Sequence, residues 1–302
     1  MIFPRHILES QQFDRKGLEE LFALADTLEG VRNTSLQGKI MASLFYEPST
    51  RTRLSFESAM QRLGGTVIST ENAKEFSSAA KGETIEDTMR MMNQYADVVV
   101  LRHFKEGACG RAARVASIPV INAGDGPGQH PTQALLDLYT IQRETGKTDG
   151  LHIAAVGDLK HGRTIRSLAY LLTRYENISL TFVSPPELAM GADILEYLRA
   201  RGVLVIETED LESVLADTDV IYMTRIQKER FADSGEYEKL KGKHVLTRAH
   251  ADAMKQGSII MHPLPRVDEI APDVDSSEKA VYFKQAGYGL SVRMALLTKL
   301  LS

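Results

Sequence analysis

Short apolar runs alternate with longer helical segments along most of this 302-residue chain. The clearest run is Asp97–Arg102, whose Val-Val-Val-Leu centre is apolar throughout. A strand without alternating polar residues is typical of a parallel sheet that helices cover on both faces. The pattern therefore predicts an α/β protein built on doubly wound parallel sheets.

Two such series follow one another, divided by the breaker-rich loop Gly124–Gly128 and a long helix from about His130 to Thr145. We expect two doubly wound domains, each with a parallel sheet flanked by helices. The first should cover residues 1–134, with a C-terminal helix of about 286–302 packing back on it, and the second residues 135–285. The predicted strands are Lys39–Tyr46, Thr66–Thr70, Asp97–Arg102, Pro119–Asn122, His152–Val156, Ser179–Val183, Val203–Ile206, Val220–Thr224 and Ser258–Met261. The other predicted helices are Thr52–Leu63, Glu83–Tyr95, Gly110–Ala116, Thr164–Tyr175, Ile194–Arg201, Leu211–Ala216 and Gly289–Leu301.

Composition argues against several classes of protein. A formal net charge of -4 gives no reason to expect a nucleic-acid partner. No stretch approaches the roughly 20 apolar residues that span a bilayer, so no membrane association is expected. The one cysteine, Cys109, allows neither an internal disulfide nor a thiolate metal cluster, and it suits a cytoplasmic protein. We expect no metal and no other cofactor.

The string Ser49-Thr50-Arg51-Thr52-Arg53 lies where a predicted strand ends and a helix begins. Unpaired backbone N–H groups and the helix dipole favour anions there, and arginine side chains grip phosphate oxygens. A serine or threonine that only caps the helix is the simpler explanation for either hydroxyl alone. The whole string, with both Arg51 and Arg53, favours a phosphate site.

Two further signals are weaker when taken singly. Arg102 and His103 end a buried strand, where open α/β sheets bind ligands, although an ordinary charged strand end would look the same. His130 precedes a proline at a helix start, and Gln133 follows one turn later on the same face. A histidine in this position is more often structural.

Residues Gly157–Thr164 suggest a different function. The segment mimics the nucleotide-binding P-loop, but Arg163 stands where that motif needs lysine. No acidic strand end suited to magnesium accompanies it. A nucleoside triphosphatase is therefore the weaker hypothesis.

Three motifs taken in order resemble one family. Ser49–Arg53, His130–Gln133 and His-Pro-Leu-Pro at His262–Pro265 are similar to the carbamoyltransferases, and the likeness runs from Phe45 to the end. Ornithine-specific members usually carry His-Cys-Leu-Pro at the last motif. The segment Thr224–Arg230 also looks like the aspartate-binding loop of the aspartate-specific members.

The resemblance implies transfer of a carbamoyl group from carbamoyl phosphate to L-aspartate, giving N-carbamoyl-L-aspartate and phosphate in pyrimidine biosynthesis. It implies a carbamoyl-phosphate site made by Ser49, Thr50, Arg51, Thr52, Ser77, Lys81, Arg102, His130, Gln133 and Leu264, the last through its backbone carbonyl. The implied aspartate-binding residues are Lys81, Arg163, Arg225 and Gln227, and the implied catalytic residues are Thr52, Arg102, His130 and Lys81. Two arginines also suit a substrate with two carboxylates.

The family also implies a homotrimer, in which Ser77 and Lys81 reach a neighbouring chain's site, and possible zinc-containing regulatory chains. His161 departs from the family pattern, in which we expect tyrosine. A scaffold of this shape without catalytic activity is the remaining alternative. The intact charged residues of the motifs argue against it.

Overall fold

The computed structural model describes residues 3–228, 231 and 233–302. The chain forms two compact units. Unit 1 comprises Met1–Leu136 and Ala286–Ser302, and unit 2 comprises Asp137–Gln285. Helices α6 (Pro131–Thr145) and α11 (Tyr282–Leu301) each contain a boundary between the units.

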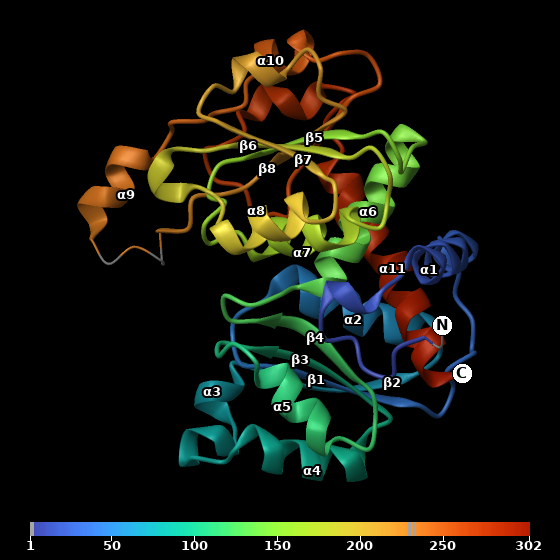
Figure 1. Ribbon diagram of the computed structural model, residues 1–302. Coiled ribbons are helices and arrows are strands. Elements are labelled where there is room, and N and C mark those ends of the chain that lie inside the picture. Colours follow the sequence, from blue (N-terminus) through green and yellow to red (C-terminus); the bar gives the residue numbers. More distant parts are fainter. Residues whose placement is uncertain (1–2, 229–230, 232) are drawn as a thin grey trace. The chain divides into compact units, whose positions relative to one another are not determined.

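Unit 1 is built on a four-stranded parallel sheet in the order β2-β1-β3-β4. Figure 1 shows α4 and α5 on one face of this sheet and α2 on the other. The central strand β3 is buried along Val98–Leu101, as its unbroken apolar run predicts. The elements are α1 (Arg15–Leu28), β1 (Ile40–Phe45), α2 (Thr50–Arg62), β2 (Thr66–Glu71), α3 (Ala73–Phe76), α4 (Ile85–Tyr95), β3 (Val98–His103), α5 (Ala108–Val115) and β4 (Val120–Asp125).

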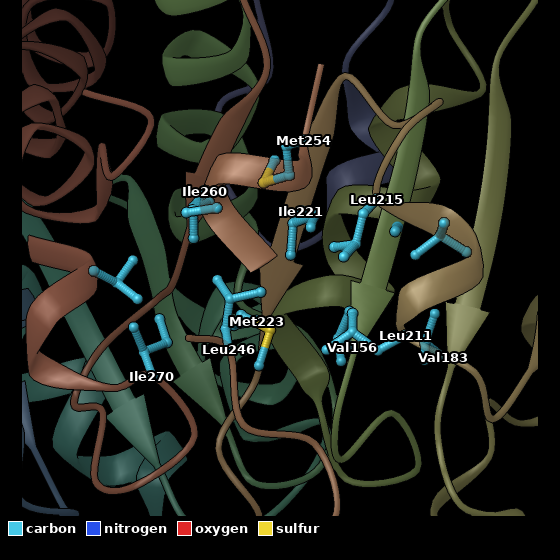
Figure 2. Packing of buried hydrophobic residues seen from close by; sticks show 14 of the residues in the cluster. Val156, Val183, Leu211, Leu215, Ile221, Met223, Leu246, Met254, Ile260 and Ile270 are labelled. Atoms are coloured by element: carbon cyan, nitrogen blue, oxygen red, sulfur yellow. The ribbon is translucent and has the colours of Figure 1, made fainter. Parts of the chain in front are cut away.

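Unit 2 is built on a five-stranded parallel sheet in the order β7-β6-β5-β8-β9. Its buried apolar cluster includes Val156, Ile221 and Ile260 from three neighbouring strands, with Leu215 and Met254 packed against them (Figure 2). The elements are β5 (His152–Val156), α7 (Arg163–Leu172), β6 (Ser179–Val183), α8 (Ala192–Arg199), β7 (Leu204–Thr208), β8 (Val220–Met223), α9 (Ser234–Leu240), α10 (Arg248–Ala253) and β9 (Ile259–Met261).

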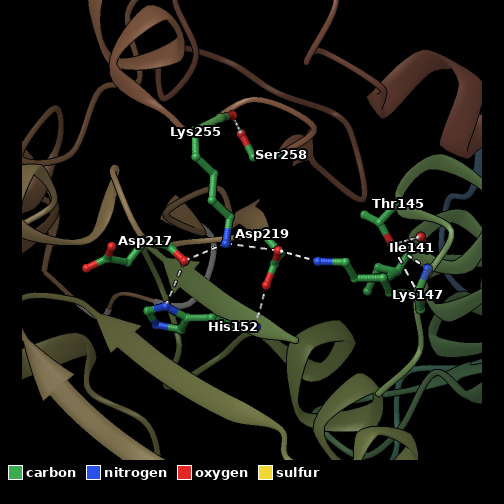
Figure 3. Close-up of polar contacts among 8 residues, drawn as sticks. All are labelled: Ile141, Thr145, Lys147, His152, Asp217, Asp219, Lys255 and Ser258. Carbon is green, nitrogen blue, oxygen red and sulfur yellow. Dashed lines mark hydrogen bonds and ion pairs between the residues drawn. The ribbon is translucent and has the colours of Figure 1, made fainter. Parts of the chain in front are cut away.

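A carboxylate fastens the amino-terminal edge of the second sheet (Figure 3). Asp219 accepts the backbone N–H of His152 at 2.9 Å and forms an ion pair of 2.9 Å with Lys255. The Lys255 ammonium also donates to the carbonyl of Asp217 at 2.8 Å. Burial alone would raise the pKa of Asp219, but the His152 N–H and the Lys255 ammonium outweigh it and lower that pKa. The cluster therefore joins the starts of β5 and β8.

The predicted fold class is confirmed, and several element boundaries differ from the prediction. Strand β4 continues through Gly124 to Asp125, so the loop begins only at Gly126. The predicted helix Leu211–Ala216 is a single 3₁₀ turn over Glu212–Val214. Helix α11 begins at Tyr282 rather than Gly289, because tertiary packing outweighs the low helix propensity of its glycines.

Four α-helices of the described ranges went unpredicted. The first, α1, begins after Asp14, whose carboxylate accepts the N–H of Gly17 and caps it. The other three are the short helices α3, α9 and α10. Of the helices in the described ranges, none is both long and apolar enough to cross a membrane.

Candidate active site

The carboxyl ends of β1, β3 and β4 in unit 1 lead into the predicted phosphate and carbonyl-binding motifs. These strands are parallel neighbours in the sheet, so their ends lie at one edge. Strand β1 leads to Ser49, β3 carries Arg102, and β4 leads to His130. The fold therefore brings together three motifs that are well separated in the sequence.

Ser49 and Arg102 are in direct contact at this edge. Ser49 is the N-cap residue of α2, yet its side chain makes no capping hydrogen bond. Its hydroxyl accepts from Arg102 Nη1 at 3.3 Å instead, and Arg102 Nε lies 3.5 Å from a carboxylate oxygen of Glu47. The simple capping explanation therefore does not hold for Ser49.

The arginines of this motif differ from one another. Arg51 is exposed in the first turn of α2, where Thr52 is buried. Arg53 forms ion pairs with Glu57 at 3.4 Å and Glu71 at 2.8 Å. Two carboxylates therefore compensate the charge of Arg53, whereas phosphate binding by Arg53 stays a prediction.

The loop that carries His130 from β4 to α6 is held by hydrogen bonds. Asp125 accepts the N–H of Gln129 at 3.1 Å and the N–H of Gly107 at 3.0 Å, which ties this loop to the one after β3. Gly126 has a φ of +54°, and a Cβ there would lie 2.6 Å from a backbone oxygen. His130 and Gln133 are both buried, and the His130 carbonyl accepts the Gln133 N–H at 3.0 Å.

His103, the last residue of β3, is a buried neutral histidine. Its ring stacks on Phe104 at 4.4 Å and lies 4.8 Å from the ring of Tyr46. Burial, with the nearby cations of Arg111 and Lys105, lowers the pKa of His103 to about 4. Its Nδ1 accepts the Lys105 N–H at 2.9 Å, so we assign it a structural role beside Arg102.

Ser77 and Lys81 lie in the segment that follows β2. The Ser77 hydroxyl accepts the Ala79 N–H at 3.1 Å and so caps a short 3₁₀ helix over Ser78–Lys81. Lys81 is exposed at the end of that helix, and within the described part of the chain no ion pair involves it. Both residues remain predicted site residues.

In unit 2 the carboxyl ends of β5, β8 and β9 are again neighbours. They lead to the loops that carry Arg163, Arg225 and Leu264. Gly157 has a φ of +112°, and a Cβ there would lie 2.4 Å from the carbonyl oxygen of Thr224. The first two loops therefore approach each other at a point where only glycine fits.

Asp158, fully buried, fastens these two loops together. One of its carboxylate oxygens accepts the His161 N–H at 3.0 Å, and the other accepts the Gln227 N–H at 3.3 Å. The His161 ring nitrogen Nδ1 lies 3.1 Å from the carboxylate, and Gln227 Nε2 donates to the His161 carbonyl at 3.0 Å. Asp158 was not among the predicted site residues, although its place directly after the glycine that ends a predicted strand was a signal for it.

This arrangement disfavours the nucleotide-binding alternative. A P-loop directs free backbone N–H groups at phosphate, whereas here a buried carboxylate takes the His161 N–H. The negative charge of Asp158 would also repel a phosphate. Of the predicted aspartate-binding segment, Glu229 and Arg230 lie outside the described residues. Within the described ranges, no group of three or more candidate ligand side chains could hold a metal ion.

Two family models match the chain. Residues 5–143 match the aspartate/ornithine carbamoyltransferase carbamoyl-P binding domain, and residues 149–300 match the Asp/Orn binding domain of the same enzymes. The chain belongs to the aspartate/ornithine carbamoyltransferase family.

Individual relatives are similar over almost the whole chain. Aspartate carbamoyltransferase 3, chloroplastic, of Pisum sativum is 56% identical over 98% of this chain and 77% of its own length. The catalytic subunit of the Methanocaldococcus jannaschii enzyme is 52% identical over 98% of both chains. A solved M. jannaschii catalytic subunit superposes with a TM-score of 0.91 at 51% identity, covering 98% of both chains.

A solved aspartate transcarbamoylase from Trypanosoma cruzi, in complex with carbamoyl phosphate and aspartate, has a TM-score of 0.93 at 42% identity and covers 98% of this chain and 97% of its own. These matches confirm the predicted family and the predicted class of enzyme, a carbamoyl-group transferase that acts on aspartate. They do not test the individual site residues, which remain predictions.

Proposed function

We propose that the chain transfers the carbamoyl group of carbamoyl phosphate to the amine of L-aspartate, giving N-carbamoyl-L-aspartate and phosphate in pyrimidine biosynthesis. The main support is that strands β1, β3 and β4 are neighbours in the sheet of unit 1 and that the predicted motifs follow their carboxyl ends, where Arg102 donates a hydrogen bond to Ser49. The related T. cruzi protein, solved with carbamoyl phosphate and aspartate, supports it.

In this proposal the start of α2 binds the phosphate group. The first turn of a helix offers unpaired N–H groups and a positive potential. Ser49, Thr50, Arg51 and Thr52 occupy that turn and its cap, and Arg102 adds a second guanidinium. Gln133 and the Leu264 carbonyl are assigned to the carbamoyl nitrogen.

The reaction needs hydrogen-bond donors at the carbonyl oxygen of the carbamoyl group, where negative charge develops. The neutral amine of aspartate attacks the carbamoyl carbon, a C–N bond forms, and the bond to phosphate breaks. Thr52, Arg102 and His130 are assigned to the carbonyl oxygen, where preplaced donors lower the barrier most. The leaving phosphate is the acceptor of the amine proton. Holding both substrates together supplies a large further part of the rate.

Arg163, Arg225 and Gln227 are assigned to the two carboxylates of aspartate. Support comes from the hydrogen bonds through which Asp158 joins the two loops that carry them. Arginine pairs with carboxylates through two parallel hydrogen bonds, so two arginines match a dicarboxylate.

A transfer assay that offers aspartate and ornithine side by side tests the proposal. N-carbamoyl-L-aspartate should be the main product, with ornithine left nearly untouched. Citrulline as the main product would overturn the choice of substrate, and ATP hydrolysis without aspartate would favour the nucleotide-binding alternative.

We further propose a homotrimer in which Ser77 and Lys81 of one chain complete the site of its neighbour. Support comes from the family resemblance and from the exposure of Lys81. Lys81→Ala removes a residue that a chain contributes to its neighbour's site, and Arg51→Ala removes a residue of the chain's own site. Each variant alone should be almost inactive, whereas mixed trimers should regain activity.

The complementation experiment requires that subunits be dissociated and reassembled together, with mixed trimers verified by mass. Each variant reassembled alone is the control. Activity in the mixture no higher than in these controls would show that Lys81 is not shared between chains.

Zinc-containing regulatory chains remain a proposed partner, supported by relatives that are named catalytic subunits. A cytoplasmic location is also proposed, supported by the single buried thiol of Cys109. Several plant relatives are named chloroplastic, so the compartment varies within the family. Co-purification of the native protein and cell fractionation test these two proposals.

A further inference from the structure

A chain of buried hydrogen bonds runs through unit 2. The Tyr222 hydroxyl donates to one oxygen of Asp137 at 2.7 Å, and Gln285 Nε2 donates to the other at 2.6 Å. The Gln285 side-chain oxygen accepts the backbone N–H of His262 at 2.9 Å. All four residues are at most 1% exposed. Buried networks with satisfied partners hold their members rigidly.

The chain continues through the His262 ring. Nδ1 accepts the N–H of Leu264 at 2.7 Å, because a backbone N–H can only donate. Nε2 therefore carries the hydrogen, and it donates to Glu269 at 2.7 Å. Both ring nitrogens of His262 are thus used, so the ring is not available for proton transfer with a substrate.

Glu269 closes the loop that begins at His262. Its second oxygen accepts the N–H groups of Val267 and Asp268, each at 3.2 Å. Burial alone would raise the pKa of Glu269, but the hydrogen bond from His262 and the backbone N–H groups outweigh it and lower that pKa. An ionised, buried carboxylate therefore fixes the shape of residues 262–269.

Leu264 has an unusual backbone within this loop. Its φ is +54°, in the left-handed region that branched side chains avoid. Such conformations persist where the surroundings hold them, and they concentrate at ligand-binding sites. The His262 ring holds the N–H side of this residue, and no hydrogen bond from the described residues reaches the Leu264 carbonyl oxygen.

We propose that His262 is a positioning residue, which through the buried chain directs the Leu264 carbonyl at the carbamoyl nitrogen and so selects carbamoyl phosphate over other acyl phosphates. The inference rests on the proposed function. A carbonyl oxygen can accept from an NH₂ group but gains nothing from a methyl group. Sites that are built to bond an N–H reject analogues that lack it.

Two substitutions separate the roles of the two ring nitrogens. In His262→Gln the side-chain nitrogen takes the place of Nε2, so the donor to Glu269 is kept and the acceptor for Leu264 is lost. In His262→Asn the side-chain oxygen takes the place of Nδ1, so the acceptor for Leu264 is kept. The measurements are KM for carbamoyl phosphate at saturating aspartate and Ki for acetyl phosphate, which carries a methyl group instead of the amine.

His262→Gln should raise KM for carbamoyl phosphate by about tenfold, the worth of one hydrogen bond, with Ki for acetyl phosphate within about twofold. In His262→Asn the ratio of the two constants should stay within about threefold of the unsubstituted chain. His250→Gln is the matched control, because His250 Nδ1 accepts the backbone N–H of Thr247 at 3.2 Å and its Nε2 lies 3.5 Å from a carboxylate oxygen of Glu212, while none of these residues belongs to the proposed site. It should change neither constant.

Equal changes in both constants in His262→Gln would show a purely structural role and overturn the inference, as would no change in either. If His262→Gln does not fold, His262→Asn decides. A ratio of KM for carbamoyl phosphate to Ki for acetyl phosphate that differs more than about threefold from that of the unsubstituted chain overturns the inference, and a ratio within that range supports it. Failure of the proposed function would appear separately, as absence of carbamoyl transfer in the unsubstituted chain, and would overturn both.

Discussion

Asp158→Asn is the substitution that should most clearly separate the binding of the two substrates. Asp158 is fully buried and serves the His161 N–H, the His161 ring and the Gln227 N–H. An asparagine of the same size keeps one acceptor oxygen and replaces the other with a donor. Whichever way the amide turns, an N–H group of the protein then faces an N–H group of the side chain.

The expected cost follows from these contacts. A hydrogen bond to a charged group contributes about 1.5–3 kcal/mol, and a buried donor left unpaired costs about as much. We therefore expect the hydrogen bonds that hold together the two loops carrying Arg163 and Arg225 to become weaker by about 2–3 kcal/mol of free energy. Since about 1.4 kcal/mol is tenfold, kcat/KM for aspartate should fall by about 30- to 150-fold.

Initial rates with varied aspartate at saturating carbamoyl phosphate measure this effect, and rates with varied carbamoyl phosphate measure its selectivity. KM for carbamoyl phosphate should change by less than about threefold, because the phosphate-binding residues are assigned to unit 1. Asp149→Asn is the matched control. Asp149 is a half-buried aspartate of the same unit that accepts the backbone N–H of Glu176 at 2.8 Å.

Thermal unfolding of each variant completes the experiment. If the Asp158→Asn protein melts at a lower temperature but keeps its kcat/KM for aspartate, the restraint serves only folding. An equal loss for both substrates would likewise refute the reasoning, since it would show that Asp158 does not act on the aspartate loops alone.

The remaining predictions concern other residues. His130→Ala should lower kcat by roughly 10²–10³, as the loss of an oxyanion donor does, with carbamoyl phosphate still bound; an unchanged kcat would leave His130 a structural residue. Arg225→Ala should weaken aspartate binding by about 2–5 kcal/mol, if the substrate carboxylate that it pairs with stays buried, and should weaken carbamoyl phosphate binding much less. A raised KM for carbamoyl phosphate with a normal KM for aspartate would show that Arg225 binds the other substrate. Asp219→Asn should lower the free energy of unfolding by about 2 kcal/mol at neutral pH. Because the pKa of Asp219 is lowered in the folded state, this stabilisation is fully present above its ordinary pKa of about 4 and disappears as the pH falls through the folded value. Denaturant titrations of both proteins between neutral pH and pH 3 check it, and a difference that does not become smaller below pH 4 would contradict it.

The sequence by itself determined the fold class and the motifs. Unbroken apolar runs such as Val98–Leu101 are local signals, and burial on both faces is their only stable outcome in a globular protein. The strings around Ser49, His130 and His262 also needed no structure to be found, because each combines its chemistry within a few consecutive residues. Where an element depends on packing, as α11 does at Gly289, local propensity predicted its start poorly.

Tertiary structure alone decided which of these side chains have partners. The sequence alone suggests Arg53 as a phosphate ligand, but Glu71, which lies 18 residues later, compensates its charge. Gln227, which donates to Asp158, and Gln285, which accepts from His262, likewise come from distant segments. A side chain's availability depends on what lies within about 3 Å of it, and hydrogen bonds at that range arise from the order of strands in the sheet, which no local pattern encodes.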